Sequence, residues 1–102
     1  MPTPPLLAEA EIQAALRTLP GWRREGATLC RGLRFGSFAR AFAFMTAVAE
    51  QAEALNHHPD WRNVYDRVDI CLHTHDAGGL TALDVELARR ISDLATRLGE
   101  EA

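Results

Sequence analysis

The stretch SFARAFAFMTAVAEQAEALNHHP, residues 37–59, decides the fold, because it predicts one long helix with a sharp end. Its apolar residues recur at intervals of three and four, the spacing of one helix face: Phe38, Phe42, Met45, Val48, Ala49, Ala52 and Leu55. Ser37 is a favoured residue at a helix N-terminus. Pro59 disfavours the helical conformation for His58, so the helix should end as the pair His57-His58 begins. We therefore expect a main core helix with two histidines at its exit.

Both flanks of this helix carry the alternating pattern of strands. Upstream, every second residue is apolar, namely Ala27, Leu29, Leu33 and Phe35, with Arg31 as the exception. This pattern predicts a strand pair that turns near Glu25-Gly26. Downstream, residues 61–75 alternate in the same way, with Val64, Val68, Ile70, Leu72 and Thr74 on one parity. Two short strands with a turn near Asp66-Arg67 fit this segment, and one long bent strand fits it as well.

Two further helices are expected outside the strands. Residues 8–19 place Ile12, Ala15, Leu16 and Leu19 on one stripe. After a loop at 76–79, Thr81 and Asp84 match a capping box, in which two side chains satisfy backbone N–H groups at a helix start. The order is helix, two strands, helix, two strands, helix. It predicts an α+β fold in which the three helices pack on one face of an antiparallel sheet.

The size and charge of the chain limit its class. Its 102 residues suit a single domain, residues 1–102, with one hydrophobic core. A net charge of −3 provides no electrostatic attraction for nucleic acid or an anionic membrane. No apolar run reaches the roughly 18 residues of a membrane span, and no secretory signal pattern begins the chain. We therefore expect a cytoplasmic protein without direct nucleic-acid or membrane contacts.

Cys30 and Cys71 lie far apart, each in an alternating apolar segment. We expect each to be a buried free thiol, with a disulfide between them as the alternative.

The adjacent histidines are the first candidates for chemistry. Imidazole titrates near neutral pH, so histidines can both donate and accept protons in a reaction. The alternative is a solvated cap, because an imidazolium is favoured at the negative end of a helix. Glu53 lies one helical turn before His57, where it could orient that imidazole or belong to a solvated helix face.

Other histidines extend the candidate site. His75 closes the last strand beside a Gly-Gly loop, a place where sites are often assembled. A metal site is an alternative, because His73 and His75 lie two apart on a strand and His57 or His58 could complete a three-histidine set. The sequence has no HExxH or paired CxxC motif, and we do not favour a metal.

These residues together resemble a known family. Glu53, three residues, His57-His58-Pro59, five residues, Tyr65, nine residues, His75, eight residues and Asp84 are similar to the signature of the pterin-4a-carbinolamine dehydratases. Further similar stretches are Gly21-Trp22, WRNVYDRVDICLHTH at 61–75 and GGLTALD at 78–84. The resemblance spans roughly residues 16–98.

The resemblance implies a four-stranded antiparallel sheet with helices on one side, and a hydro-lyase. Such enzymes convert 4a-hydroxytetrahydrobiopterin, left by aromatic amino acid hydroxylases, to quinonoid dihydropterin and water in tetrahydropterin recycling. No metal or cofactor takes part. A general acid protonates the leaving C4a hydroxyl, and a general base removes the proton on ring nitrogen N5. The resemblance assigns His57, His58 and His75 as the catalytic and substrate-binding set, without deciding which is acid and which is base.

The resemblance also assigns supporting roles. Glu53 is expected beside His57, and Asp84 is expected to line the site in addition to capping its helix. Thr74 is expected to place its backbone or hydroxyl against the pterin. Trp22 matches a tryptophan near the pterin pocket, although a core aromatic is an equal alternative. Asn56 stands where many relatives carry an acid.

Two other functions stay open. Some relatives have lost histidines and serve in assembly, and an animal member is a dimerisation cofactor of a homeodomain transcription factor. A non-catalytic binding or assembly module is therefore one alternative, and a dehydratase acting on another pterin is the other. A homodimer or homotetramer is expected in each case, through sheet-edge and helix contacts.

Overall fold

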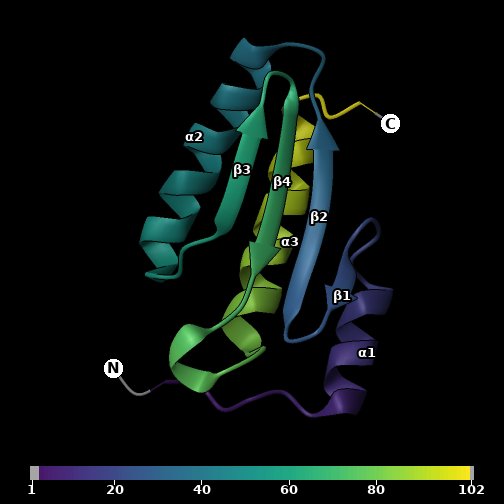
Figure 1. Cartoon of the computed structure of the whole chain (residues 1–102), viewed down its shortest axis with the longest axis vertical. Helices are drawn as coiled ribbons and strands as arrows, with labels where there is room; N and C mark the ends of the chain where they lie inside the picture. Colours follow the sequence, from purple (N-terminus) through teal and green to yellow (C-terminus); the bar gives the residue numbers. More distant parts are fainter. Residues whose placement is uncertain (1–2, 102) are drawn as a thin grey trace.

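The computed structural model describes residues 3–101 and contains the predicted elements in the predicted order (Figure 1). Their bounds are α1 Glu9–Arg17, β1 Arg23–Glu25, β2 Thr28–Arg34, α2 Phe38–Leu55, β3 Asp60–Val64, β4 Arg67–Leu72, the 3₁₀ turn η1 His75–Ala77 and α3 Ala82–Arg97. The strands form one antiparallel sheet in the order β1-β2-β4-β3. The prediction of an α+β fold is confirmed, and residues 61–75 form two strands rather than one bent strand.

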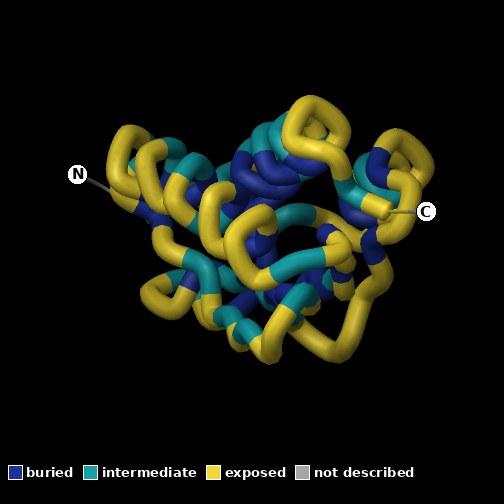
Figure 2. Tube along the Cα trace, turned by 90° about the horizontal axis from the view of Figure 1, so that it is seen from above, coloured by how far each residue is buried: buried dark blue, intermediate teal, exposed yellow. Residues whose placement is uncertain are grey.

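The hydrophobic core lies on one face of this sheet. β2 and β4 send alternate side chains into it, namely Leu29, Leu33, Val68, Ile70 and Leu72, all buried. From α2 and α3 come Phe44, Val48, Leu87 and Ile91, and α1 adds Ile12. In Figure 2 the buried positions accordingly gather in the interior, beneath exposed loops. Burying one large apolar side chain contributes about 1.5–3 kcal/mol, so this layer is the main source of stability.

Arg31, the exception in the apolar pattern of β2, is accommodated by the C-terminal residues. Its guanidinium donates to both carboxylate oxygens of Glu100, at 2.7 and 2.9 Å, and to the hydroxyl of Ser92 at 3.1 Å. Only about 13% of the Arg31 side chain is exposed. A charge on the core side of a strand is tolerated because its partners replace the lost water.

The helix ends follow the predicted capping signals. The Ser37 hydroxyl accepts a hydrogen bond from the N–H of Arg40 at 3.2 Å, and Thr81 with Asp84 forms the capping box of α3. α2 ends at Asn56, which adopts the left-handed conformation at φ 49°. Asparagine tolerates this conformation better than most residues, and it turns the chain away from the helix axis. No helix within residues 3–101 is long and apolar enough to cross a membrane.

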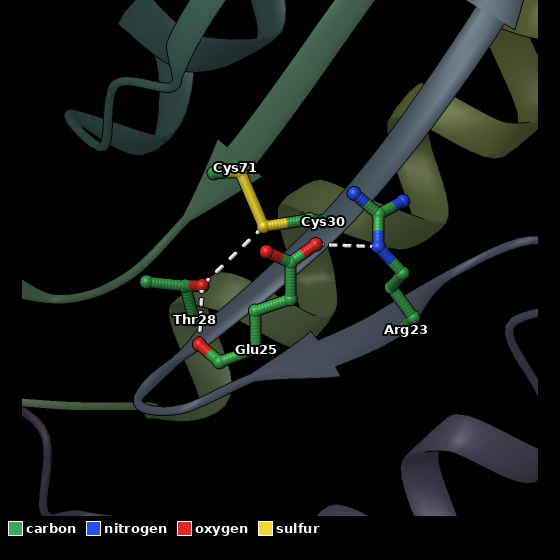
Figure 3. The surroundings of a disulfide bond; sticks show 5 residues. All are labelled: Arg23, Glu25, Thr28, Cys30 and Cys71. Atoms are coloured by element: carbon green, nitrogen blue, oxygen red, sulfur yellow. Dashed lines mark hydrogen bonds and ion pairs between the residues drawn. A yellow bond between two sulfur atoms is a disulfide. The ribbon is translucent and has the colours of Figure 1, made fainter.

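The expectation of two free thiols is wrong, because Cys30 and Cys71 form a disulfide between β2 and β4 (Figure 3). The two cysteines are direct partners in the antiparallel register, with their Cα atoms 4.2 Å apart, although 41 positions separate them in the sequence. The Thr28 hydroxyl lies 3.3 Å from the sulfur of Cys30. Strand pairing, which residue periodicity does not specify, brings the two sulfurs together.

Candidate active site

One cavity, of about 620 Å³, gathers all four histidines of the chain. His57 and His58 enter it from the exit of α2, and His73 and His75 enter it from the end of β4. The remaining lining residues are Thr3, Pro4, Ala54, Leu55, Asn56, Thr74, Asp76 and Leu83. This volume lies within the range of roughly 300–1,000 Å³ that is usual for small-molecule sites.

A second cavity, of about 540 Å³, lies between β2 and the C-terminal residues and carries no imidazole. Its charged lining residues include Arg31 and Glu100, which already neutralise each other. The histidine cavity is therefore the stronger candidate for chemistry.

The most firmly held histidine is His57, whose Nε2 lies 2.6 Å from Oδ1 of Asp84. Asp84 is fully buried in the first turn of α3. Its other oxygen, Oδ2, accepts from the Thr74 hydroxyl at 2.8 Å and from the N–H of Thr81 at 2.9 Å. A buried carboxylate is costly unless hydrogen bonds satisfy it, and here three donors do so.

The loop after β4 brings these groups together. Thr74 pairs with Gly79 in an isolated antiparallel bridge, and its N–H donates to the Gly79 carbonyl at 2.8 Å. Between them Gly78 has φ 76°, a conformation that glycine adopts without strain. The chain thus folds back on itself within five residues, and α3 begins next to the end of β4 (Figure 1).

Glu53 contacts a different histidine from the one expected. Its Oε2 lies 2.5 Å from Nε2 of His58, and both side chains are mostly exposed. The expectation of a Glu53–His57 pair assumed that the helix continues through His57, whereas the left-handed Asn56 ends it. After this turn, the His57 ring lies inward against Asp84 and His58 stays near the last turn of α2.

The two histidines after β4 lie close to each other. The ring centroids of His73 and His75 are 6.3 Å apart, with the ring planes at 73°. His73 is half-buried and His75 is exposed. Within residues 3–101 no group of three or more His, Cys, Asp or Glu side chains has the arrangement of a metal site.

The structure does not bring Trp22 to this cavity. The side chain is buried in the core, and its Nε1 donates to the Ser92 hydroxyl at 2.8 Å. Sequence reasoning treated Thr81 as a helix cap alone and His73 as a metal-site candidate alone. The structure places Thr81 against Thr74 and His73 in the cavity wall. For Thr81, the capping partner Asp84 was the available signal, because that residue also belongs to the family signature.

Several known proteins are similar to this chain in sequence. The family model described as "Pterin 4 alpha carbinolamine dehydratase" matches residues 5–94. A protein of Opitutus terrae is 55% identical over 93 residues, covering 90% of this chain and 96% of its own. A protein of Afipia carboxidovorans is 50% identical over 96 residues, covering 92% and 96%. Both carry the name "Putative pterin-4-alpha-carbinolamine dehydratase".

Two solved structures share the fold. A crystal structure from Brucella melitensis, described as a "transcriptional coactivator/pterin dehydratase", superposes with a TM-score of 0.86 at 42% identity, covering 88% of this chain and 98% of its own. A pterin dehydratase-like protein, described as a RuBisCO assembly factor in the alpha-carboxysome, gives a TM-score of 0.63 at 29% identity, covering 74% and 89%. On the extent of these matches, the chain belongs to the pterin-4-alpha-carbinolamine dehydratase family.

Proposed function

We propose that this protein dehydrates 4a-hydroxytetrahydrobiopterin to quinonoid dihydropterin and water by histidine acid–base catalysis. Family membership supplies the reaction class. The observation that carries the assignment of residues is the cavity lined by His57, His58 and His75, in which Asp84 holds one imidazole from behind. The reaction needs no redox change, since the C4a–O bond breaks and the proton leaves N5, while the electrons of the N–H bond stay behind and form the new double bond between N5 and C4a.

His57 is the proposed general base. Its Nε2 is engaged by Asp84, so Nδ1 is the nitrogen left to accept the proton from N5 of the pterin. When the proton arrives, the ring becomes an imidazolium, and the adjacent carboxylate stabilises that charge. Asp84 is in this scheme a positioning residue, because it acts on the substrate through His57.

The proposed proton donor to the C4a hydroxyl is His58 or His75. One ring nitrogen of His58 is occupied by Glu53, which leaves the other for the substrate. His75 is exposed and lines the cavity from the segment that follows β4. A well-placed acid or base contributes about 10² to 10⁴ in rate, so loss of the correct residue is measurable.

The proposal places the protein in cytoplasmic tetrahydropterin recycling, where an aromatic amino acid hydroxylase supplies the substrate and no metal or cofactor is required. Other pterins share the same ring, and a dehydratase for one of them would use the same three imidazoles, His57, His58 and His75.

One observation favours a protein interface on α2, which is expected for a dehydratase and for a binding module alike. Phe38 and Phe42 lie one turn apart on α2 with their ring centroids 5.8 Å apart, and each is half-exposed. Exposed paired aromatics on a helix are typical of protein interfaces. We propose a second copy of this chain as the occupant, which gives a homodimer or homotetramer.

The test of the catalytic proposal is the dehydration rate of freshly generated 4a-hydroxytetrahydrobiopterin, measured with and without a chelator. The variants are His57→Ala, His58→Ala and His75→Ala, with Thr46→Ala on the exposed side of α2 as the control. We expect acceleration that survives the chelator and that falls by about tenfold or more in at least one histidine variant. No acceleration by folded wild-type protein would refute the proposal and would put the binding module first.

A further inference from the structure

The carboxylate behind His57 is itself held by two buried hydroxyl groups. The Thr74 hydroxyl lies 2.8 Å from Oδ2 of Asp84, and the hydroxyls of Thr74 and Thr81 lie 2.7 Å apart. The N–H of Leu83 in turn donates to the Thr81 hydroxyl at 3.2 Å. Thr74 and Thr81 are both buried, and Thr81 has no exposed surface.

Hydrogen-bond counting fixes the direction of this chain. An ionised carboxylate only accepts, so the single proton of the Thr74 hydroxyl is donated to Asp84. The contact between the hydroxyls must then be a donation from Thr81 to Thr74. Each hydroxyl donates once and accepts once, and hydrogen bonds aligned in this way strengthen one another.

The same counting assigns the proton on His57. With Asp84 ionised, the group that faces Oδ1 must be a donor, which places the proton on Nε2 and the lone pair of the neutral ring on Nδ1. Within residues 3–101 no fully buried side-chain nitrogen or oxygen lacks a partner. Nδ1 of His57 makes no hydrogen bond to these residues, so it retains access to the cavity that His57 lines.

We propose that Thr81 is a positioning residue of the active site, whose hydroxyl, through that of Thr74, orients the Asp84 carboxylate and thereby holds His57 in the tautomer with the proton on Nε2. The expected effect of Thr81 on catalysis rests on the proposed function, whereas its expected effect on the His57 tautomer is independent of that function. This relay keeps His57 able to act as a base. In the other tautomer Nδ1 would carry a proton and could not accept the proton that must leave the substrate.

A capping role alone does not account for the contact with Thr74. To cap α3, the Thr81 hydroxyl needs only to accept from a backbone N–H, and the Leu83 N–H fulfils that need. The hydroxyl proton is not required for capping, yet it is donated to Thr74. The other ionisable groups at the cavity are His58, His73, His75 and Asp76, and Glu53 lies beside His58. Within the described residues none of them makes a hydrogen bond to this relay.

The first test reads the tautomer directly, without substrate. Nitrogen NMR of the histidine rings at mildly alkaline pH distinguishes Nε2–H from Nδ1–H in wild-type protein, Thr81→Val, Thr74→Val and Thr81→Ser. We expect Nε2–H for His57 in the wild type and in Thr81→Ser, and a mixture of tautomers in both valine variants. The control is Ser37→Val, which removes the equivalent N-cap from α2 and so matches the loss of a cap. It should leave the His57 tautomer unchanged.

The second test compares kinetics in the same variants. Thr81 does not line the cavity, so Thr81→Val should lower kcat by about tenfold with little change in KM, and Thr81→Ser should restore it. A wild-type proton on Nδ1, or valine variants with unaltered tautomer and kcat, would overturn the relay. Inactive wild-type protein with the expected tautomer would instead refute the proposed function and leave the relay standing. If one valine variant fails to fold, the other still tests the relay, because Thr81→Val and Thr74→Val interrupt it at different hydroxyl groups.

Discussion

His57 and His58 are adjacent in the chain, yet their side chains lie in opposite environments. About 9% of the His57 side chain is exposed and its partner Asp84 is fully buried, whereas about 57% of His58 and 77% of Glu53 are exposed. Breaking a buried pair by removing one partner typically costs about 3–5 kcal/mol. An exposed pair contributes about 0–1 kcal/mol. The first pair therefore contributes to both folding and site geometry, and the second can serve the reaction with little effect on stability.

The exposed pair gives a prediction that separates function from stability. Glu53→Ala should change the free energy of unfolding by less than about 1 kcal/mol, because water replaces the lost partner of His58. Dehydration should nevertheless slow if Glu53 orients His58 toward the substrate. The measurements are urea unfolding and kcat/KM, with Glu50→Ala at another exposed position of the same helix as the control. Equal rates in both variants would remove Glu53 from the site.

The pairing of Glu53 also shows where sequence reasoning reached its limit. The rule that residues four apart are neighbours holds only while the helix continues. Asn56, at φ 49°, ends the helix one residue before His57, so the rule pointed to the wrong imidazole. A left-handed turn at a non-glycine residue is not predictable from spacing, although Pro59 did correctly predict that the helix would stop nearby.

At the scale of elements, the local patterns identified each strand and helix but not the pairing between strands. The predicted core stripe of α2 was also partly wrong, because Phe38 and Phe42 are half-exposed and Phe44 is buried. Alternation identified β2 and β4 separately, and capping residues identified the starts of α2 and α3. The sheet order β1-β2-β4-β3 depends on contacts between distant segments. For this reason the sequence did not show that Cys71 lies opposite Cys30, although the alternating pattern did place each of them in a strand.

The disulfide between β2 and β4 gives the prediction at this scale. It closes a loop of about 41 residues, and such links typically stabilise by about 2–4 kcal/mol, in the chain-entropy model by restricting the unfolded chain. Cys30→Ser/Cys71→Ser should lower the free energy of unfolding by that amount, and reductant should do the same to wild-type protein only. Urea unfolding with and without dithiothreitol measures both effects.

Thiol counting provides the check on the disulfide prediction. Protein purified without reductant should show no titratable thiol in denaturant, because both of its cysteines are joined. Two thiols per chain, together with no response of stability to reductant, would contradict the prediction. The outcome also bears on compartment, since disulfides are rare in the reducing cytosol that we expected for this protein.

At the scale of the whole molecule, the candidate site joins three segments that are distant in sequence. The exit of α2 supplies His57 and His58, the end of β4 supplies His73 to His75, and the first turn of α3 supplies Asp84. The family signature named the residues, but only the packing of these ends places them around one cavity. Trp22 also matches the family pattern, yet within a single chain its side chain lies in the core and not at the cavity.

The exposed aromatic pair on α2 gives the prediction for the assembled protein. A domain of this size buries only about 60–70% of its unfolded surface, so association adds significantly to its core. Each phenylalanine is already about half buried, so completing its burial contributes about half of the 1.5–3 kcal/mol of a fully exposed side chain, and two symmetric copies gain this twice. Wild-type protein should therefore sediment as more than one chain, and Phe38→Ser/Phe42→Ser should shift it toward the monomer.

The matched control for association is Leu98→Ser, which removes an exposed apolar side chain just after α3 and should leave the sedimentation unchanged. The histidine cavity is formed by one chain, so the monomeric variant should keep its dehydration rate per chain. Wild-type protein that is monomeric at all concentrations would contradict this prediction. Loss of activity in a folded monomeric variant would instead show that a second copy contributes to the site, because neither phenylalanine lines the cavity.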